Sequence, residues 1–373
     1  MMLWEAWLAE TQTGQLSAKL AVLSGTWDES AGAAESVSVV ANKGPLKALD
    51  PARWLVPWKT SVVLTADGQP ILFGPVTGVP KISRNTVQFP VGGVVDILAQ
   101  RYATADDYGP GQGTELAESV LSYSGLSLGS IMWRLVQQAM NRRGGALPIV
   151  HGSPDEASIH ERNYRGFDIS NLDTAHLLDL LSGVIGGPDY RFDAQWADEE
   201  HRRVQWAFRH GTTVSTDIPQ QLVLTVDTTA PRAPISAPDV VCSWAPTGKV
   251  YATGAGEGAG VAIAVVENES AMLNMPLLEL TMSDTSAEEL PLLTQRAQAR
   301  LDRGKTMTVQ VNTSIDASVG RHPSLWHVGD IARVKLGDEW WPLPPDMTAR
   351  IVSRKGTLGS SIIDIELQAE VTV

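Results

Sequence analysis

The segment Gly125-Leu126-Ser127-Leu128-Gly129 has the spacing G-x-S-x-G, in which many hydrolases hold a nucleophilic serine. In those enzymes the serine lies on a sharp turn from a strand into a helix, and its hydroxyl is exposed. A helical pattern follows the motif, but residues 118–123 before it also have a helical pattern, and no parallel strand–helix–strand pattern surrounds it. We therefore interpret the motif as a turn between two helices and keep a serine hydrolase using Ser127 as the last of three hypotheses.

A second motif that could do chemistry is a run of four glycines, Gly254, Gly256, Gly258 and Gly260. Glycines allow backbone amides to approach a phosphate closely, as in dinucleotide sites and phosphate loops. The next residues, 261–266, are β-branched and strand-like, so no helix N-terminus is available, and the Lys-Ser/Thr pair of a phosphate loop is absent. This pattern favours an adaptable loop between two strands and predicts no bound cofactor.

Metal ligands have no recognisable spacing in this chain. Seven histidines include no H-E-x-x-H motif, and one cysteine cannot form a thiolate zinc cluster. A cluster of acids could bind Ca²⁺ or act as a carboxylate pair, but it lacks the spacing of an EF-hand. We interpret these acids as residues of solvated turns: Asp189, Asp193, Asp198, Glu199 and Glu200. We therefore expect no metal site and no enzyme.

Tryptophan is abundant, with twelve residues against five phenylalanines. Tryptophan is enriched at interfaces because it buries a large area and its N–H still needs a partner. Trp340 and Trp341 are adjacent, so on one strand they would point to opposite faces and could not both fill one core. We expect one of them to meet another chain, and we add Trp54 and Trp58 as interface candidates. A sugar-binding platform and a second core are the alternatives.

Composition narrows the classes of protein further. The chain has 373 residues, enough for two or three domains, and 43% of them are hydrophobic. Its formal net charge of −13 disfavours specific binding to nucleic acid, although it suits a surface that DNA slides past. The lone Cys242 can form no disulfide within the chain, and no apolar stretch is long enough for a membrane span.

The elements that must position these residues differ along the chain. Residues 1–100 have the alternation of short strands, including a hairpin at Asp67-Gly68. Residues 101–230 mix helices with strands. Three helices are predicted near 114–122, 130–143 (capped by Ser130) and 173–185 (beginning at Asp173 or Thr174), and two strands are predicted around 190–192 and 204–208.

Prolines 231, 234 and 238 indicate a boundary, after which strands return around one helix at 286–303. Within this part a strand is predicted at 339–343, and the last strand alternates cleanly between apolar and polar residues. The sequence therefore predicts a mainly β fold with an α+β centre: β-barrel or sandwich domains at 1–100 and 231–373 flank an α+β domain at 101–230.

The order of several segments resembles the tail hub proteins, or minor tail proteins, of long-tailed bacteriophages, which are related to the baseplate hubs of contractile tails. The segments are WLVPWKTSVVLTADGQPILFGPVTGV, LLDLLSGVIGGPDYRFDAQW, VQWAFRHG, ATGAGEG and HVGDIARVKL. The resemblance spans nearly the whole chain, and its motifs are architectural rather than catalytic.

This resemblance implies a structural virion protein at the phage tail tip, assembled in the host cytoplasm. Such proteins form trimeric rings with two tube-like β-barrels per subunit around a channel for genome ejection. The implied partners are other copies of the chain, the distal tail or tail tube protein, tip or receptor-binding proteins and the tape measure protein. A ring that meets a neighbour of different symmetry needs adaptable loops, which suits the glycines at 254–260. A carbohydrate-binding surface module is the second hypothesis, ahead of the serine hydrolase.

Overall fold

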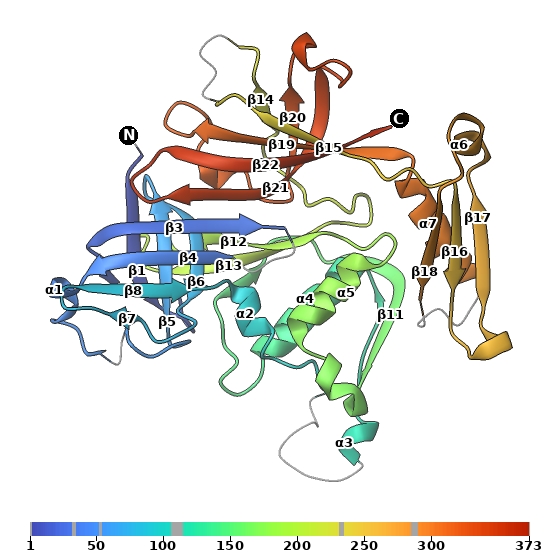
Figure 1. Cartoon of the computed structure of the whole chain (residues 1–373). Coiled ribbons are helices and arrows are strands. Elements are labelled where there is room, and N and C mark those ends of the chain that lie inside the picture. The colour runs from blue at the N-terminus through green and yellow to red at the C-terminus, as the bar shows by residue number, and fades with distance from the viewer. Residues whose placement is uncertain are drawn as a thin grey trace.

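A computed structural model describes residues 2–31, 35–51, 54–105, 115–230, 235–284 and 290–372 of the chain. Ten of its strands belong to one large sheet, which occupies the upper and left parts of Figure 1. In the described residues this sheet runs in the order β15-β19-β22-β21-β3-β4-β8-β7, with β20 beside β21 and β14 beside β20. Its strands are β3 (Val22–Ser30), β4 (Ser36–Asn42), β7 (Lys81–Ile82), β8 (Thr86–Val91), β14 (Leu224–Asp227), β15 (Asp239–Ser243), β19 (Thr306–Asp316), β20 (Ile331–Lys335), β21 (Asp346–Thr357) and β22 (Ile362–Thr372).

The large sheet joins the two ends of the chain. Strand β21 pairs antiparallel with β3, with Arg354 opposite Glu29. Side chains from both ends also share the first of three hydrophobic cores, in which Trp27 and Phe89 lie with Trp326 and Leu367. The division into domains at 1–100, 101–230 and 231–373 stays a prediction, and its second limit falls at residues 231–234, outside the described residues.

The last strand has the predicted alternation. In β22 the side chains of Ile363, Ile365 and Leu367 are buried, whereas Asp364 and Glu366 lie on the opposite, outward face. Successive side chains of a strand point to opposite faces, so this pattern requires a sheet with one apolar and one polar side. The large sheet therefore buries one face in the first core and presents a polar face outward.

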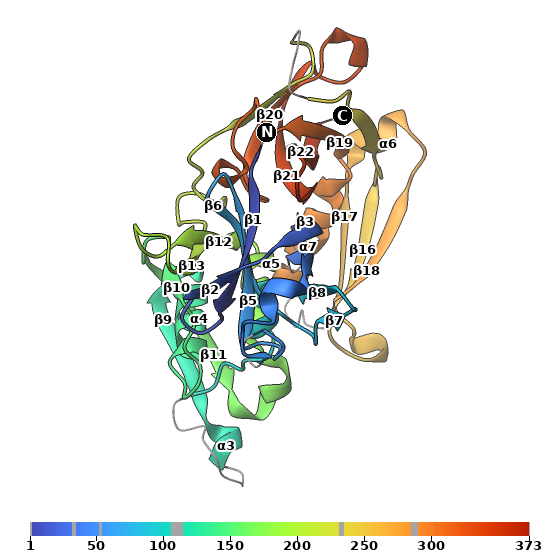
Figure 2. The ribbon, with the colours of Figure 1, turned by 90° about the vertical axis from the view of Figure 1, so that its left-hand side faces the viewer.

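A smaller sheet, in the order β2-β1-β5-β6, packs beside the N-terminal strands of the large sheet (Figure 2). The predicted hairpin lies between β5 and β6, where Asp67 and Gly68 have φ angles of 45° and 78°. Asp-Gly pairs tolerate these positive angles, which explains why this turn could be read from the sequence. The elements here are β1 (Trp4–Glu10), β2 (Leu16–Lys19), α1 (Lys43–Leu46), β5 (Thr60–Ala66) and β6 (Gln69–Pro75).

The centre of the chain combines helices with two short sheets around a second core. Helices α4 and α5 pack against each other, and α5 begins at Thr174, as predicted. Asp173 caps α5 by accepting a hydrogen bond from the His176 N–H. α5 ends at Gly183, two residues before the predicted limit. The elements are α2 (Val94–Leu98), α3 (Glu115–Glu118), β9 (Val120–Leu126), α4 (Leu128–Met140), β10 (Ile149–His151), β11 (Ala157–Arg165), α5 (Thr174–Gly183), β12 (Tyr190–Trp196) and β13 (Val204–His210).

A third unit lies between β15 and β19 in the sequence and has a core of its own. It comprises β16 (Lys249–Thr253), β17 (Ile263–Glu267), α6 (Glu269–Asn274), β18 (Glu279–Ser283) and α7 (Leu290–Arg303). Figure 1 shows this unit at the right of the molecule, beside the central helices. We call it the inserted unit. Within the described residues α7 runs from Leu290 to Arg303, and its predicted start at Ser286 lies in residues 285–289, outside the described part.

The mainly β class with an α+β centre is confirmed, but the β-rich parts do not close into barrels within the described residues. The large sheet begins at β15 and ends at β7, and these two strands are not paired with each other. The predicted helix at 114–122 is confirmed only in its first half, where residues 115–118 form α3. Its second half is wrong, because residues 120–126 form β9, which pairs with β11 and packs Leu121 and Tyr123 on the second core. No helix among the described residues is long and apolar enough to cross a lipid bilayer.

Candidate catalytic and interaction sites

Ser127 follows a strand and caps a helix. Strand β9 ends at Leu126 and α4 begins at Leu128, so the predicted turn between two helices is wrong. The Ser127 hydroxyl accepts a hydrogen bond from the Ser130 N–H at 3.1 Å and donates one to the Ser130 Oγ at 3.0 Å. Ser127 is therefore the N-cap in place of the predicted Ser130, and only 4% of it is exposed. A hydroxyl that is buried and used as a cap is not presented to a substrate.

A histidine pair lies next to α4 but serves packing. His210 is buried against Gly129, where a Cβ atom would come within 2.2 Å of the His210 Nδ1. This Nδ1 donates to the Gly211 carbonyl oxygen at 2.7 Å, so the His210 Nε2 accepts from the His151 Nε2 at 2.9 Å. Both nitrogens of His210 are thus used away from Ser127. Burial lowers the pKa of His210, and burial together with the neighbouring His210 lowers the pKa of His151 to about 4.

The acidic cluster of residues 189–200 is divided by the fold. Asp198, Glu199 and Glu200 lie in or beside the turn between β12 and β13, in agreement with the solvated-turn interpretation. Asp193 contradicts it, because it is buried on β12 and forms ion pairs of 2.7 Å with Arg191 and Arg209. Burial acts to raise the pKa of Asp193, but electrostatic interactions with His327, Arg191 and Arg209 outweigh burial and lower it. Among the described residues, no group of three His, Cys, Asp or Glu is placed to hold a metal ion.

The two adjacent tryptophans differ strongly in exposure. They do not lie on the predicted strand, because Asp338–Trp340 forms a short 3-10 helix and Trp341 follows it. Trp340 packs against the first core, whereas 84% of Trp341 is exposed. The reason is that a single turn, rather than strand alternation, separates the two rings. Trp341 thus exposes a large apolar side chain next to Trp340, which is fixed by its packing against the first core.

The other two tryptophan candidates also separate. Trp54 is buried in the first core, with its ring edge-on to Phe89 at 6.4 Å between centroids, so it offers no surface to a partner. Trp58 is about one-third exposed and has a φ of 65° in the turn before β5. Trp58 therefore stays an interface candidate, and the main expectation rests on Trp341.

The four glycines form the loop between β16 and β17. The loop is closed by a hydrogen bond of 2.8 Å from the Gly254 N–H to the Ala262 carbonyl oxygen, and its residues 256–260 are exposed. Gly256 and Gly258 have φ angles of 124° and 57°, which favour glycine. Because strand β17 follows, the loop does not lead into a helix that could hold a phosphate.

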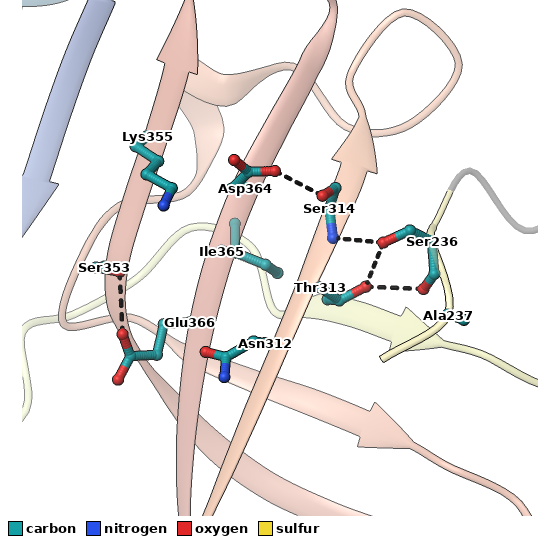
Figure 3. A pocket seen from close by; sticks show the side chains of 10 residues that line it. All are labelled: Ser236, Ala237, Asn312, Thr313, Ser314, Ser353, Lys355, Asp364, Ile365 and Glu366. Carbon is teal, nitrogen blue, oxygen red and sulfur yellow. Dashed lines mark hydrogen bonds between the residues drawn. The ribbon is translucent and has the colours of Figure 1, made fainter. Parts of the chain in front are cut away.

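A polar groove that the sequence did not single out lies on the outward face of the large sheet (Figure 3). It has a volume of about 350 Å³, and the Ser314 hydroxyl donates to Asp364 Oδ1 across it at 2.6 Å. None of its lining residues is aromatic, so the groove lacks the stacking platform that sugars favour. The alternation of β22 was the signal that could have located this polar face. The lining residues include Asn312, Ser314, Ser353, Lys355, Asp364 and Glu366.

No protein-family model and no curated protein matches this chain. Its fold is that of phage-type tail proteins, as comparison with solved structures shows. The chain is similar to the tail protein from Neisseria meningitidis MC58, with 12% identity and a TM-score of 0.55 over 98% of this chain and 96% of the other. It is also similar to the 43 kDa tail protein of prophage MuSo2 from Shewanella oneidensis, with 12% identity and a TM-score of 0.52 over 97% and 98%. A third similar structure is prophage tail protein gp18 from Listeria monocytogenes EGD-e, with 10% identity and a TM-score of 0.50 over 98% and 94%.

Proposed function

We propose that this chain is a structural component of a phage-type tail. In the proposed arrangement, copies of the chain form a trimeric hub at the distal end of the tail, joined to the tail tube or distal tail ring on one side and to tip or receptor-binding proteins on the other. The observation that carries the proposal is the likeness in fold to three tail proteins over nearly the whole of each chain. The buried, capping Ser127 agrees with a structural role rather than a hydrolytic one.

The surface at Trp341 supports assembly. An indole that is 84% exposed leaves a large apolar area in water, which is unfavourable unless another chain covers it. Trp340 packs against the core immediately before it, so the Trp341 ring projects from a firmly held backbone. An anchored aromatic side chain of this kind is typical of an interface hot spot.

The acidic residues on the outward face of the large sheet support the proposal that this face lies beside DNA. Its polar residues include the acids Asp316, Asp364, Glu366 and Glu370, with Lys355 among them. Carboxylates repel the phosphates of DNA, so DNA would pass such a face without binding to it. We propose this face for the wall of the ejection channel.

The decisive experiment is the mass of the purified chain in solution, measured by light scattering over a range of concentrations. The hub proposal expects a trimer, whereas neither a carbohydrate-binding module nor a hydrolase requires one. The hub proposal would be contradicted if the chain stays monomeric at all concentrations and does not associate with the neighbouring tail proteins when they are added.

Two tryptophan variants test the proposed interface. Trp341→Ala should weaken assembly by about tenfold or more while leaving the melting temperature of the monomer nearly unchanged. Trp340→Ala is the matched control, because the same truncation beside it removes core packing and should lower the melting temperature instead. If both variants only lower the melting temperature, Trp341 is not part of an interface.

A further inference from the structure

The inserted unit is an independent addition to the large sheet. Strands β15 and β19, which flank it in the sequence, are hydrogen-bonded neighbours in that sheet. Its core contains Val250 and Ala252 from β16 packed on Leu293, Ala297 and Leu301 of α7, separate from the other two cores. The large sheet therefore does not need this unit for its own packing.

One face of its three-stranded sheet is not covered by any element of the described part of the chain. Helix α7 packs on the face that carries Val250 and Ala252. On the opposite face Tyr251 stands between Val265 of β17 and Thr281 of β18, and Ile263 stands next to Thr253. Val265 is 47% exposed and Ile263 is 57% exposed, although both are strand residues. The outer face therefore presents an apolar centre to solvent, and the loop with the four glycines lies at its edge.

Carboxylates surround this apolar centre. Lys249 forms an ion pair with Glu267 at 2.5 Å, so the cation of this face is neutralised. The Tyr251 hydroxyl donates to Glu279 Oε1 at 2.6 Å, and Glu257 is exposed in the glycine loop. The whole chain has a net charge of −13, so a second copy would bring further negative charge to an already acidic face. Charge complementarity thus favours a basic partner over another copy of the chain.

We propose that the outer face of the inserted unit, centred on Tyr251, Ile263 and Val265, is a docking surface for a basic amphipathic segment of another protein. The partner would place apolar side chains on the exposed sheet and lysines or arginines against Glu257 and Glu279. This proposal stands on the geometry of the inserted unit and does not depend on the tail function.

The test uses two model peptides and two matched variants of the full chain. A fluorescent amphipathic peptide of leucine and lysine should bind, and the same peptide with glutamate in place of lysine should not. Val265→Lys should weaken binding of the lysine peptide by about tenfold or more. Val241→Lys is the control, because Val241 is 49% exposed on the terminal strand β15 and the substitution adds the same charge. Binding to the control should change less than about twofold.

Hydrogen exchange locates the bound peptide and verifies folding. Residues 251–267 and 279–283 should gain protection with the lysine peptide, while α7 keeps its protection in Val265→Lys. Equal loss of binding in the two variants would mean that the peptide responds only to net charge and would overturn the proposal. Equal binding of both peptides would overturn it too. The proposal would also be overturned if Val265→Lys binds the lysine peptide with unchanged affinity but loses self-association, because a second copy of the chain would then be the occupant.

Discussion

Arg354 of β21 and Glu29 of β3 lie opposite each other on adjacent strands of the large sheet. The Arg354 Nε donates to the Glu29 Oε2 at 2.5 Å, although 325 positions separate the two residues in the sequence. The Arg354 Nη1 donates to the carbonyl oxygens of Pro323 and Trp326 at 2.6 and 2.5 Å. Its guanidinium also lies over the rings of Trp27 and Trp326, at 5.6 and 5.4 Å from their centroids. This buried cation is compensated by a carboxylate, two carbonyls and two aromatic faces, and it ties the N-terminal strands to the C-terminal ones.

Removing one partner of this pair should therefore be costly. Arg354→Leu leaves the Glu29 carboxylate buried without its cation, and we expect the free energy of unfolding in urea to fall by about 3–5 kcal/mol. The double variant Arg354→Leu with Glu29→Gln carries no uncompensated charge, so it should be more stable than the single variant. A loss below about 1 kcal/mol in the single variant would show that the pair contributes no more than an exposed ion pair.

Substitution of Ser127 distinguishes a helix cap from a nucleophile. Ser127→Ala should lower the free energy of unfolding by about 1 kcal/mol, because the Ser130 N–H loses its acceptor at the start of α4. Ser127→Asp keeps a capping oxygen and should lose less. Hydrolysis of short-chain esters by the unmodified chain, abolished in Ser127→Ala, would instead restore the catalytic interpretation.

Local patterns predicted local structure well. The Asp67-Gly68 turn, the start of α5 at Thr174 and the alternation of β22 each depend on residues a few positions apart, and the structure confirms all three. β9 was missed because its fold depends on pairing with β11, which lies about 40 residues further along the chain. Its residues therefore follow a distant partner rather than their own helical spacing.

The candidate site residues show the same limit. The sequence could indicate that Trp340 and Trp341 would differ in environment, but it assigned the difference to a strand, whereas a short 3-10 helix produces it. The pairing of Arg354 with Glu29 had no signal in the sequence, because it arises only when β21 meets β3. Likewise Asp193 is buried by residues from three separate segments, and its position near a polar turn was misleading.

The histidine pair predicts a loss of stability in mild acid. The folded chain lowers the pKa of His151 from the ordinary value of 6.5 to about 4, mainly through burial, and lowers that of His210 as well. Between these values the unfolded chain binds more protons than the folded chain, so the free energy of unfolding should decrease as the pH falls below 6.5. Protonation of both rings would also place two N–H groups against each other at the 2.9 Å contact.

His151→Gln tests this dependence, because it removes the titrating ring nearest the surface. Its free energy of unfolding, measured at a series of pH values from 7 down to about 4, should fall less steeply than that of the unmodified chain. The nearby Asp155 acts in the opposite direction on the pKa of His151, so Asp155→Asn should make the loss in acid steeper. Parallel curves for His151→Gln and the unmodified chain would assign the acid sensitivity to other groups.

The glycine loop gives a matched pair of substitutions within one turn. At Gly256 the φ of 124° is unfavourable for any side chain, and a Cβ atom would come within 2.4 Å of the Gly260 carbonyl oxygen. Gly256→Ala should therefore destabilise the inserted unit by at least about 1 kcal/mol. At Gly260 a Cβ atom meets open space at an ordinary φ, so Gly260→Ala should be neutral or stabilise the unit by up to about 1 kcal/mol, since it reduces the freedom of the unfolded chain.

Amide exchange in β16 and β17 measures both effects: faster exchange is expected only for Gly256→Ala. Equal exchange in the two variants would mean that the loop has no fixed conformation in the isolated chain, in which case its glycines provide adaptability rather than a particular turn.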